Sequence, residues 1–208
     1  MAFKYPQFLV NTDWLAEHLN DTDIRVLDCT AFNMPDGNGG IRAESGHESW
    51  EAEHIPGAGH ADLVTDLSDE SSAFRYMLPP VSQFAKAMSG YGVGAGTRVV
   101  LYDSTSGSWA TRIWWMLRVF GFDDAYILNG GLHKWKLENR PLSTEAPAYP
   151  PAIFHAKPRA GLMADQSEVL SAIKDGATCV INALSSDQHL GKGGANYGRA
   201  GRIADSVN

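Results

Sequence analysis

Asp103 stands where an apolar strand passes through a short polar loop into an apolar helix. The stretch reads "VVLYDSTSGSWATRIWWML", from Val99 to Leu117. Such a turn directs backbone N–H groups and the positive end of a helix at one point, which suits an anion or a reactive anionic side chain. A carboxylate is a hard, weak nucleophile, so we expect Asp103 to accept hydrogen bonds from the loop amides or to cap the helix. A role as an acid or an alternative nucleophile is the second interpretation.

Two cysteines, Cys29 and Cys179, are the other side chains that could supply a nucleophile. Cys29 closes the apolar run "IRVLDC" and Cys179 opens "CVINAL", so we expect the thiols at opposite ends of comparable strands. That placement and a reducing cytosol both argue against a disulfide. We expect both to be buried structural thiols. The role of Cys29 stays open, because sites are built at strand ends.

Three histidines and one aspartate raise the question of a metal site. His47, His54, His60 and Asp62 have separations that fit no common zinc pattern, and the chain has no CxxC. His54 is expected to make a structural hydrogen bond. The "GVGAG" run at 92–96 precedes its strand, whereas a dinucleotide fingerprint follows one, so we expect a helix C-cap and turn there. We therefore predict neither a metal nor a cofactor.

The elements that position these residues alternate along the chain. Short apolar strands are predicted at 24–29, 59–63, 98–103, 124–129 and 178–183. Helical patterns lie at 12–20, 81–92, 109–121 and 131–139. This alternation predicts an α/β fold with a central parallel sheet flanked by helices. Within the third helix, Arg112 and Arg118 are expected to form salt bridges.

Composition excludes several classes of protein. The chain has 208 residues, 44% of them hydrophobic, and a net charge of -7, which argues against nucleic acid and anionic membranes as partners. No run of about 18 apolar residues is present, so no transmembrane helix is expected. The N-terminus lacks the apolar core of a signal peptide, and a cytoplasmic location is the default expectation.

A proline-rich stretch interrupts the alternation, and the opening pattern then starts again. "MADQSEVLSAIKDGATCVINA" repeats the plan of "NTDWLAEHLNDTDIRVLDC", and "GRAGRIADSVN" parallels "EAEHIPGAGHADL". Two matches in the same order indicate an internal repeat. We expect one domain over 8–143, a linker over 144–160, and over 161–208 the start of a second copy, truncated before its equivalent of the Asp103 strand.

Five segments together carry a family likeness: "HIPGA" (54–58), "YMLPP" (76–80), "YGVGAGTRVVLYD" (91–103), "RIWWMLRVFG" (112–121) and "LNGGLHKW" (128–135). In this order and spacing the chain resembles the N-terminal domain of the two-domain rhodanese-type sulfurtransferases. That family includes the thiosulfate and 3-mercaptopyruvate sulfurtransferases. The resemblance implies two α/β rhodanese-like domains in tandem, of which the C-terminal one is catalytic. There a cysteine becomes a persulfide and passes its sulfur to a thiophilic acceptor.

The resemblance also assigns positions in this sequence. Asp103 matches the catalytic cysteine, which implies a non-catalytic first domain with no catalytic residue of its own. In the second copy, basic residues would hold the anionic end of the sulfur donor; Arg199 is the nearest match and Lys192 lies close by. Gln188 stands where an arginine is usual and Arg202 replaces the motif's histidine. These departures leave the identity of the donor open.

The activity expected of the chain follows from these positions. Neither cysteine occupies the nucleophile's place, so we expect negligible sulfurtransferase activity from the 208 residues alone. The parent enzyme would act on a small anionic sulfur donor and a thiophilic acceptor. The alternative is a non-catalytic rhodanese-like module that binds or scaffolds a partner. Phosphatase chemistry of the related type needs Cys-x5-Arg, which the sequence does not contain.

Overall fold

The computed structural model describes residues 3–38, 40–193 and 199–208. The chain divides into two compact units. One consists of residues 1–32 and 44–159, and the other of residues 33–43 and 160–208.

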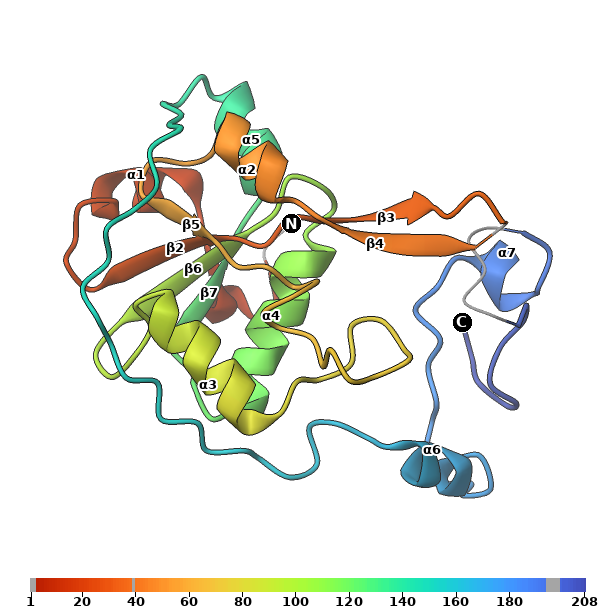
Figure 1. The fold of residues 1–208 in the computed structure, drawn as a ribbon. Helices are drawn as coiled ribbons and strands as arrows, with labels where there is room; N and C mark the ends of the chain where they lie inside the picture. Colours follow the sequence, from red (N-terminus) through yellow and green to blue (C-terminus); the bar gives the residue numbers. More distant parts are fainter. Residues whose placement is uncertain (1–2, 39, 194–198) are drawn as a thin grey trace. The chain divides into compact units, whose positions relative to one another are not determined.

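The first unit is built on a five-stranded sheet whose neighbouring strands run parallel (Figure 1). In spatial order the strands are β1 (Leu9–Val10), β7 (Ala125–Leu128), β6 (Arg98–Tyr102), β2 (Ile24–Asp28) and β5 (Ala58–His60). At its centre Val26 of β2 lies opposite both Val100 of β6 and Ala58 of β5. The predicted α/β fold with a central parallel sheet is confirmed, as are strands at the first four predicted places.

Helices cover both faces of this sheet (Figure 1). They are the 3-10 helix η1 (Pro6–Phe8) and the α-helices α1 (Thr12–His18), α2 (His47–Ala52), α3 (Val81–Gly90), α4 (Ser108–Val119) and α5 (Gly131–Leu137). Side chains of α3 and α4 pack in one buried cluster, and those of α1 and α5 pack in another. The four predicted helices are therefore present, whereas η1 and α2 were not predicted.

Successive side chains of β2 and β6 point to opposite faces of the sheet, so each strand contributes to both buried clusters. Leu27 and Leu101 contact the α3–α4 cluster, while Val26, Val100 and Tyr102 contact the α1–α5 cluster. All five side chains are almost fully buried. Strands buried on both faces lack the alternation of apolar and polar residues, which explains the consecutive apolar residues 26–27 in β2 and 99–102 in β6.

The glycine run after α3 forms a turn. Gly92 has φ +71°, its N–H donates to the Ser89 carbonyl at 3.1 Å, and the N–H of Val93 donates to Met88 at 2.9 Å. A Cβ on Gly92 would lie 2.7 Å from the Cβ of Tyr149. The predicted helix C-cap and turn at 92–96 is confirmed.

Three strands were not predicted: the two-residue strand β1 at the edge of the main sheet, and the strands β3 and β4. β3 (Ala31–Pro35) and β4 (Ile41–Ser45) form a separate two-stranded sheet. The Asp36 N–H donates to the Gly40 carbonyl at 3.1 Å, and Asp36 Oδ1 accepts from the N–H groups of Asn38 and Gly40. An Asx-type turn of this kind closes the connection between the strands.

The segment 160–208 contains the helices α6 (Gln166–Ala172) and α7 (Ser186–His189). Asp165 and Glu168 form a capping box at the start of α6, which confirms the predicted N-capped helix. The strand predicted at 178–183 is wrong: among the described residues, this stretch makes only an isolated bridge from Ile181 to Val207. The second copy and the domain bounds therefore stay predictions. None of the described helices is long and apolar enough to cross a membrane.

Candidate functional site

The Asp103 side chain is enclosed by the turn that joins β6 to α4. Its Oδ1 accepts from the N–H groups of Thr105 (2.8 Å) and Gly107 (2.9 Å) and from the Thr105 hydroxyl (2.9 Å). Its Oδ2 accepts from the N–H groups of Trp109 (3.1 Å) and Ala110 (3.0 Å) at the start of α4. Asp103 is only 2% exposed. The predicted hydrogen bonds to the loop amides and the helix start are confirmed.

This geometry determines what the turn can do. Four backbone N–H groups and one hydroxyl converge on one point, as in a cradle for an anion. Here the carboxylate of the chain itself accepts all five hydrogen bonds. The turn therefore holds its own side chain in place and has no thiol at that point.

The ends of β2 and β6 lie side by side in the sheet, and the chain leaves them in opposite directions. β2 continues toward β5 on one side, while β6 continues toward β7 on the other. In parallel sheets this reversal of strand order opens a crevice at the carboxyl ends of the strands, where ligands generally bind. The residues after these two strands are therefore the first candidates for a site.

A hydrogen-bonded row connects the two strand ends. Asp28 Oδ1 accepts from the Thr30 hydroxyl at 2.5 Å and from the Thr30 N–H at 2.8 Å. The Ser104 N–H donates to the Thr30 hydroxyl at 3.0 Å. Burial raises the pKa of the Asp28 carboxyl, and the hydrogen bonds from Thr30 oppose that shift.

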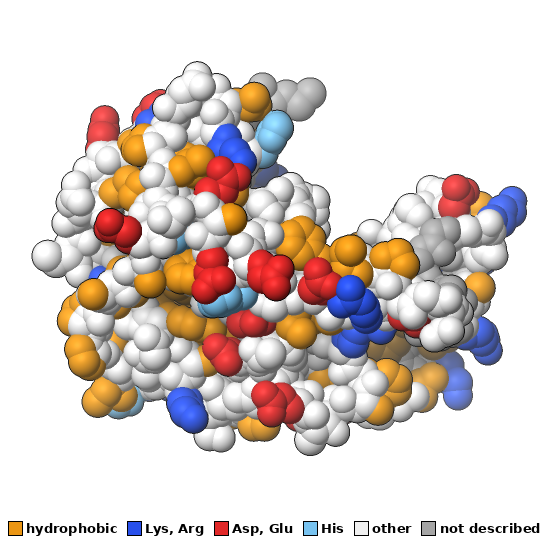
Figure 2. All heavy atoms as spheres, turned by 45° about the horizontal axis from the view of Figure 1, so that its top comes forward, with side chains coloured by type: hydrophobic (Ala, Val, Ile, Leu, Met, Phe, Trp, Pro, Cys, Tyr) orange, Lys and Arg blue, Asp and Glu red, His pale blue; other side chains and the backbone are white. Residues whose placement is uncertain are grey.

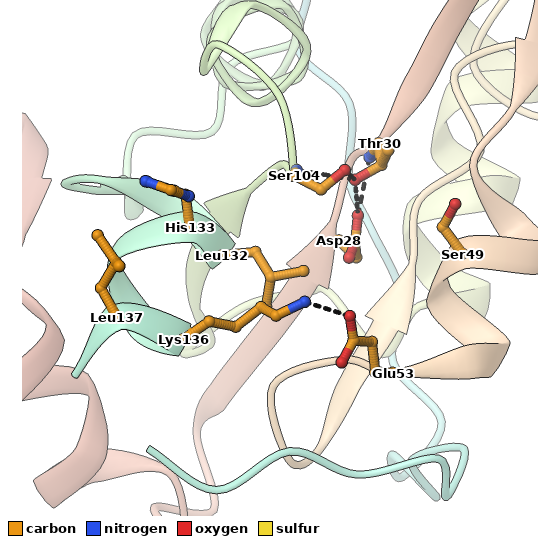
Figure 3. A pocket seen from close by; sticks show the side chains of 9 residues that line it. All are labelled: Asp28, Thr30, Ser49, Glu53, Ser104, Leu132, His133, Lys136 and Leu137. Atoms are coloured by element: carbon orange, nitrogen blue, oxygen red, sulfur yellow. Dashed lines mark hydrogen bonds and ion pairs between the residues drawn. The ribbon is translucent and has the colours of Figure 1, made fainter. Parts of the chain in front are cut away.

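A pocket of about 500 Å³ opens beside this row (Figure 3). Nine residues line it: Asp28, Thr30, Ser49, Glu53, Ser104, Leu132, His133, Lys136 and Leu137. Lys136 of α5 forms an ion pair with Glu53, at the end of α2. The lining offers hydroxyls, carboxylates and one ammonium group, which suits a small polar ligand.

The sequence did not single out this lining. Thr30 and Ser104 could have been found, because each lies within two residues of a predicted strand end. Glu53 and Lys136 are 83 residues apart, and no motif joins them.

Cys29 is a buried thiol next to the row. It is fully buried, and its Sγ lies 3.5 Å from the Leu27 carbonyl. Burial raises the pKa of the Cys29 thiol, and the nearby carboxylates of Asp28 and Asp103 raise it further. A thiol held in its protonated form is a poor nucleophile, which fits a structural role. Cys179 is exposed, so the prediction that both thiols are buried is wrong for Cys179.

The histidines occupy different surroundings. His54 is buried, its Nδ1 lies 2.6 Å from the Trp50 carbonyl, and its Nε2 lies 3.1 Å from that of Glu145. This confirms the structural hydrogen bond expected for His54. His47 and His60 meet edge to face with ring centroids 5.4 Å apart. Within the described residues no group of three or more His, Cys, Asp or Glu side chains is arranged to hold a metal.

The two arginines of α4 differ from each other. Arg118 lies 3.4 Å from Asp123, as predicted for a salt bridge. Arg112 instead donates to the Tyr76 carbonyl at 2.8 Å, and burial lowers the pKa of its guanidinium. A carbonyl partner in place of a carboxylate makes the salt-bridge prediction wrong for Arg112.

Arg199 and Lys192 lie in the second unit. Arg199 is exposed and lines a largely apolar pocket of about 700 Å³ with Arg202. Lys192 is exposed and is not part of that lining. Gln188, at the position where the resemblance implies an arginine, belongs to the capping box that starts α7. The structure thus gives Arg199 a pocket but does not bring Lys192 into it.

Known proteins are similar to this chain in sequence and in architecture. A family model described as the rhodanese-like domain matches residues 11–138. The sulfur carrier protein TtuD of Thermus thermophilus is 32% identical over 196 residues, covering 92% of this chain and 63% of that protein. Thiosulfate sulfurtransferase of Cricetulus griseus is 32% identical over 189 residues, covering 88% and 61%.

A solved structure of a sulfotransferase is also similar to this chain. SseA of Escherichia coli, a 3-mercaptopyruvate sulfotransferase, superposes with a TM-score of 0.79 at 30% identity. The match covers 97% of this chain and 74% of that one. The chain spans about three fifths of the length of the two curated relatives.

Proposed function

Because this chain belongs to the rhodanese-like family, we propose that it is part of a sulfurtransferase and supplies that enzyme's non-catalytic domain. The substrates would be thiosulfate or 3-mercaptopyruvate as donor and a thiophilic acceptor, handled in the cytoplasm. The observation that carries the proposal is the Asp103 carboxylate, which accepts the hydrogen bonds that a persulfide anion would need. A carboxylate there preserves the turn and supplies no sulfur nucleophile.

The proposed chemistry needs a thiolate at an equivalent turn. The thiolate attacks the outer sulfur of thiosulfate, the sulfur–sulfur bond breaks, and sulfite leaves with the bonding electrons. The acceptor, for example cyanide, then attacks the terminal sulfur of the persulfide, which forms thiocyanate and regenerates the thiolate. Convergent N–H groups lower the pKa of such a thiol and stabilise the charge on the persulfide.

In this proposal the thiolate belongs to a second copy that residues 161–208 begin. Arg199 is proposed to contact the anionic end of the donor there, and Lys192 is the second candidate. The exposure of Arg199 beside a pocket supports this role. The repeat of the opening pattern supports the tandem arrangement.

The test uses thiosulfate and cyanide with the 208-residue chain and with Asp103→Cys. Wild type should form no thiocyanate above the blank, because the turn carries the Asp103 carboxylate in place of a thiol and Cys29, the thiol of the same unit, is fully buried. Asp103→Cys should gain one sulfur atom from thiosulfate by intact mass, since the same N–H groups would face the new sulfur. Wild-type turnover that Cys29→Ser or Cys179→Ser abolishes would contradict the proposal. So would an Asp103→Cys protein that folds but takes up no sulfur.

A further inference from the structure

A second pocket in the first unit differs in chemistry from the one beside Asp103. It has a volume of about 450 Å³ and lies among α2, the end of β5 and residues 146–149. Its ring-bearing and acidic lining residues are His47, Trp50, His60, Tyr91, Tyr149, Asp62 and Asp66. None of the residues that line it is a lysine or an arginine. The proposed sulfur transfer does not involve this pocket. Its lining includes His47, His60 and Asp62, for which the sequence suggested no metal site.

Aromatic rings form one wall. The ring centroid of Trp50 lies 5.3 Å from that of His47 and 6.2 Å from that of His60. Trp50 also stacks on the buried His54 ring at 4.7 Å, and it is 9% exposed. The indole N–H donates to the Ala58 carbonyl at 2.8 Å, which fixes the ring in place. A preorganised aromatic wall attracts cations through its π faces.

Two carboxylates supply negative charge. Asp62 accepts from the Ser45 hydroxyl at 2.7 Å and from the Val64 N–H at 2.8 Å, and such hydrogen bonds outweigh burial and lower its pKa. Asp66 accepts from the Tyr91 hydroxyl at 2.7 Å. In the described part of the chain neither carboxylate has a lysine or arginine partner. Their charge is therefore available to a ligand.

Two cationic side chains, Arg25 and Lys86, lie next to residues of this pocket without lining it. The Arg25 guanidinium lies over the Tyr149 ring at 4.8 Å and donates to the Gly92 carbonyl. Lys86 lines an adjoining hollow that also includes Asp66. Acidic side chains gather beside a histidine on the face shown in Figure 2. Because Asp62 and Asp66 line the pocket and no lysine or arginine does, a cation from solution would meet a local negative potential there.

We propose that this pocket binds a small organic cation of the alkylammonium or quaternary ammonium class. The rings would contact the alkyl groups, and Asp62 and Asp66 would balance the charge. The volume suits a ligand of a few to a dozen heavy atoms rather than a bare metal ion. This site is separate from the Asp103 turn, so it stands or falls independently of the sulfur transfer.

The test compares choline with its neutral isostere, 3,3-dimethylbutan-1-ol, at pH 8, where imidazole is generally uncharged. Titration is followed by the ¹H–¹⁵N signal of the Trp50 indole. Choline should shift that signal in a saturable way, and the isostere should bind at least about threefold more weakly, since it lacks the cation–π attraction. Equal affinity for the two compounds, or no shift up to millimolar concentrations of choline, would overturn the proposal.

A pair of matched variants tests whether a carboxylate inside the pocket, rather than any nearby carboxylate, contributes to choline binding. Asp66→Asn removes one carboxylate from the pocket, while Glu48→Gln removes one from an exposed position on α2 that is not part of the lining. Asp66→Asn should weaken choline binding about threefold or more, and Glu48→Gln should leave it unchanged. Equal losses in the two variants would show a diffuse charge effect and refute the site.

Discussion

Asp103 holds the β6–α4 turn together through five hydrogen bonds. Asp103→Ala leaves four backbone N–H groups without their partner in a largely buried place. An unsatisfied buried donor costs about 1–3 kcal/mol. We expect the variant to lose about 3 kcal/mol or more of its free energy of unfolding, measured by urea denaturation followed by circular dichroism.

Two further variants, Asp103→Asn and the control Asp124→Ala, show how much of the lost stability comes from the negative charge of Asp103. In Asp103→Asn the carbonyl oxygen still accepts from Thr105 and Gly107, but the amide nitrogen faces the N–H groups of Trp109 and Ala110. Its loss of stability should fall between those of Asp103→Ala and of the control Asp124→Ala. Asp124 is exposed, so its truncation should change stability by no more than about 0.5 kcal/mol. An Asp103→Ala protein as stable as the control would refute the structural role.

The environment of a single residue can be predicted from the sequence when its hydrogen-bond or ion-pair partners lie close to it in the chain. The donors to Asp103 all lie within seven residues of it, so the sequence could predict their hydrogen bonds. Burial of Cys179 would need a neighbouring strand, which the described part of the chain does not form, so its exposure could not be predicted. The same limit applies to the Glu53–Lys136 ion pair, whose partners only the complete fold brings together.

At the scale of elements, four of the five strands in the main sheet were predictable, whereas the two-residue β1 and the separate strands β3 and β4 were not. β2 and β6 direct apolar side chains to both faces of the sheet because helices cover both of their faces. β3 is largely exposed and ends at Pro35, so its sequence lacks the pattern of a buried strand. The run at 178–183 has that pattern, yet Ile181 is 70% exposed. A strand needs a paired neighbour as well as apolar side chains.

The start of α5 packs against the Asp103 turn, and a glycine permits this contact. Gly131 has φ +55°, and a Cβ added to it would lie 2.6 Å from the Asp103 carbonyl oxygen. Gly107 has φ +82°, but a Cβ there would meet no atom within 4 Å. Gly131→Ala should therefore lose more stability than Gly107→Ala, by roughly 1–3 kcal/mol in urea denaturation, because only Gly131→Ala adds a steric clash to the backbone strain. Equal losses would mean that the backbone conformation alone requires both glycines.

At the scale of the whole molecule, the buried hydrophobic side chains are concentrated in one of the two units. Both hydrophobic clusters lie in the first unit. Among the described residues of 160–208 no hydrophobic side chain is classed as buried, and α6 has no buried residue. Leu170 and Val207 are about half exposed. Local stability follows the density of buried contacts, so the two parts should open with different free energies.

Amide hydrogen exchange tests this difference on the intact chain. Peptides that contain β2 or β6 should exchange only through global unfolding, since their side chains are buried on both faces. Peptides from 166–172 and 178–189 should exchange at least about ten times faster, because local opening there uncovers little apolar surface. The α1 helix is the matched control for α6, since both have seven residues and side-chain N-caps, but α1 buries Leu15. Protection of α6 equal to that of α1 would show that other contacts cover its apolar side chains, and would contradict the prediction.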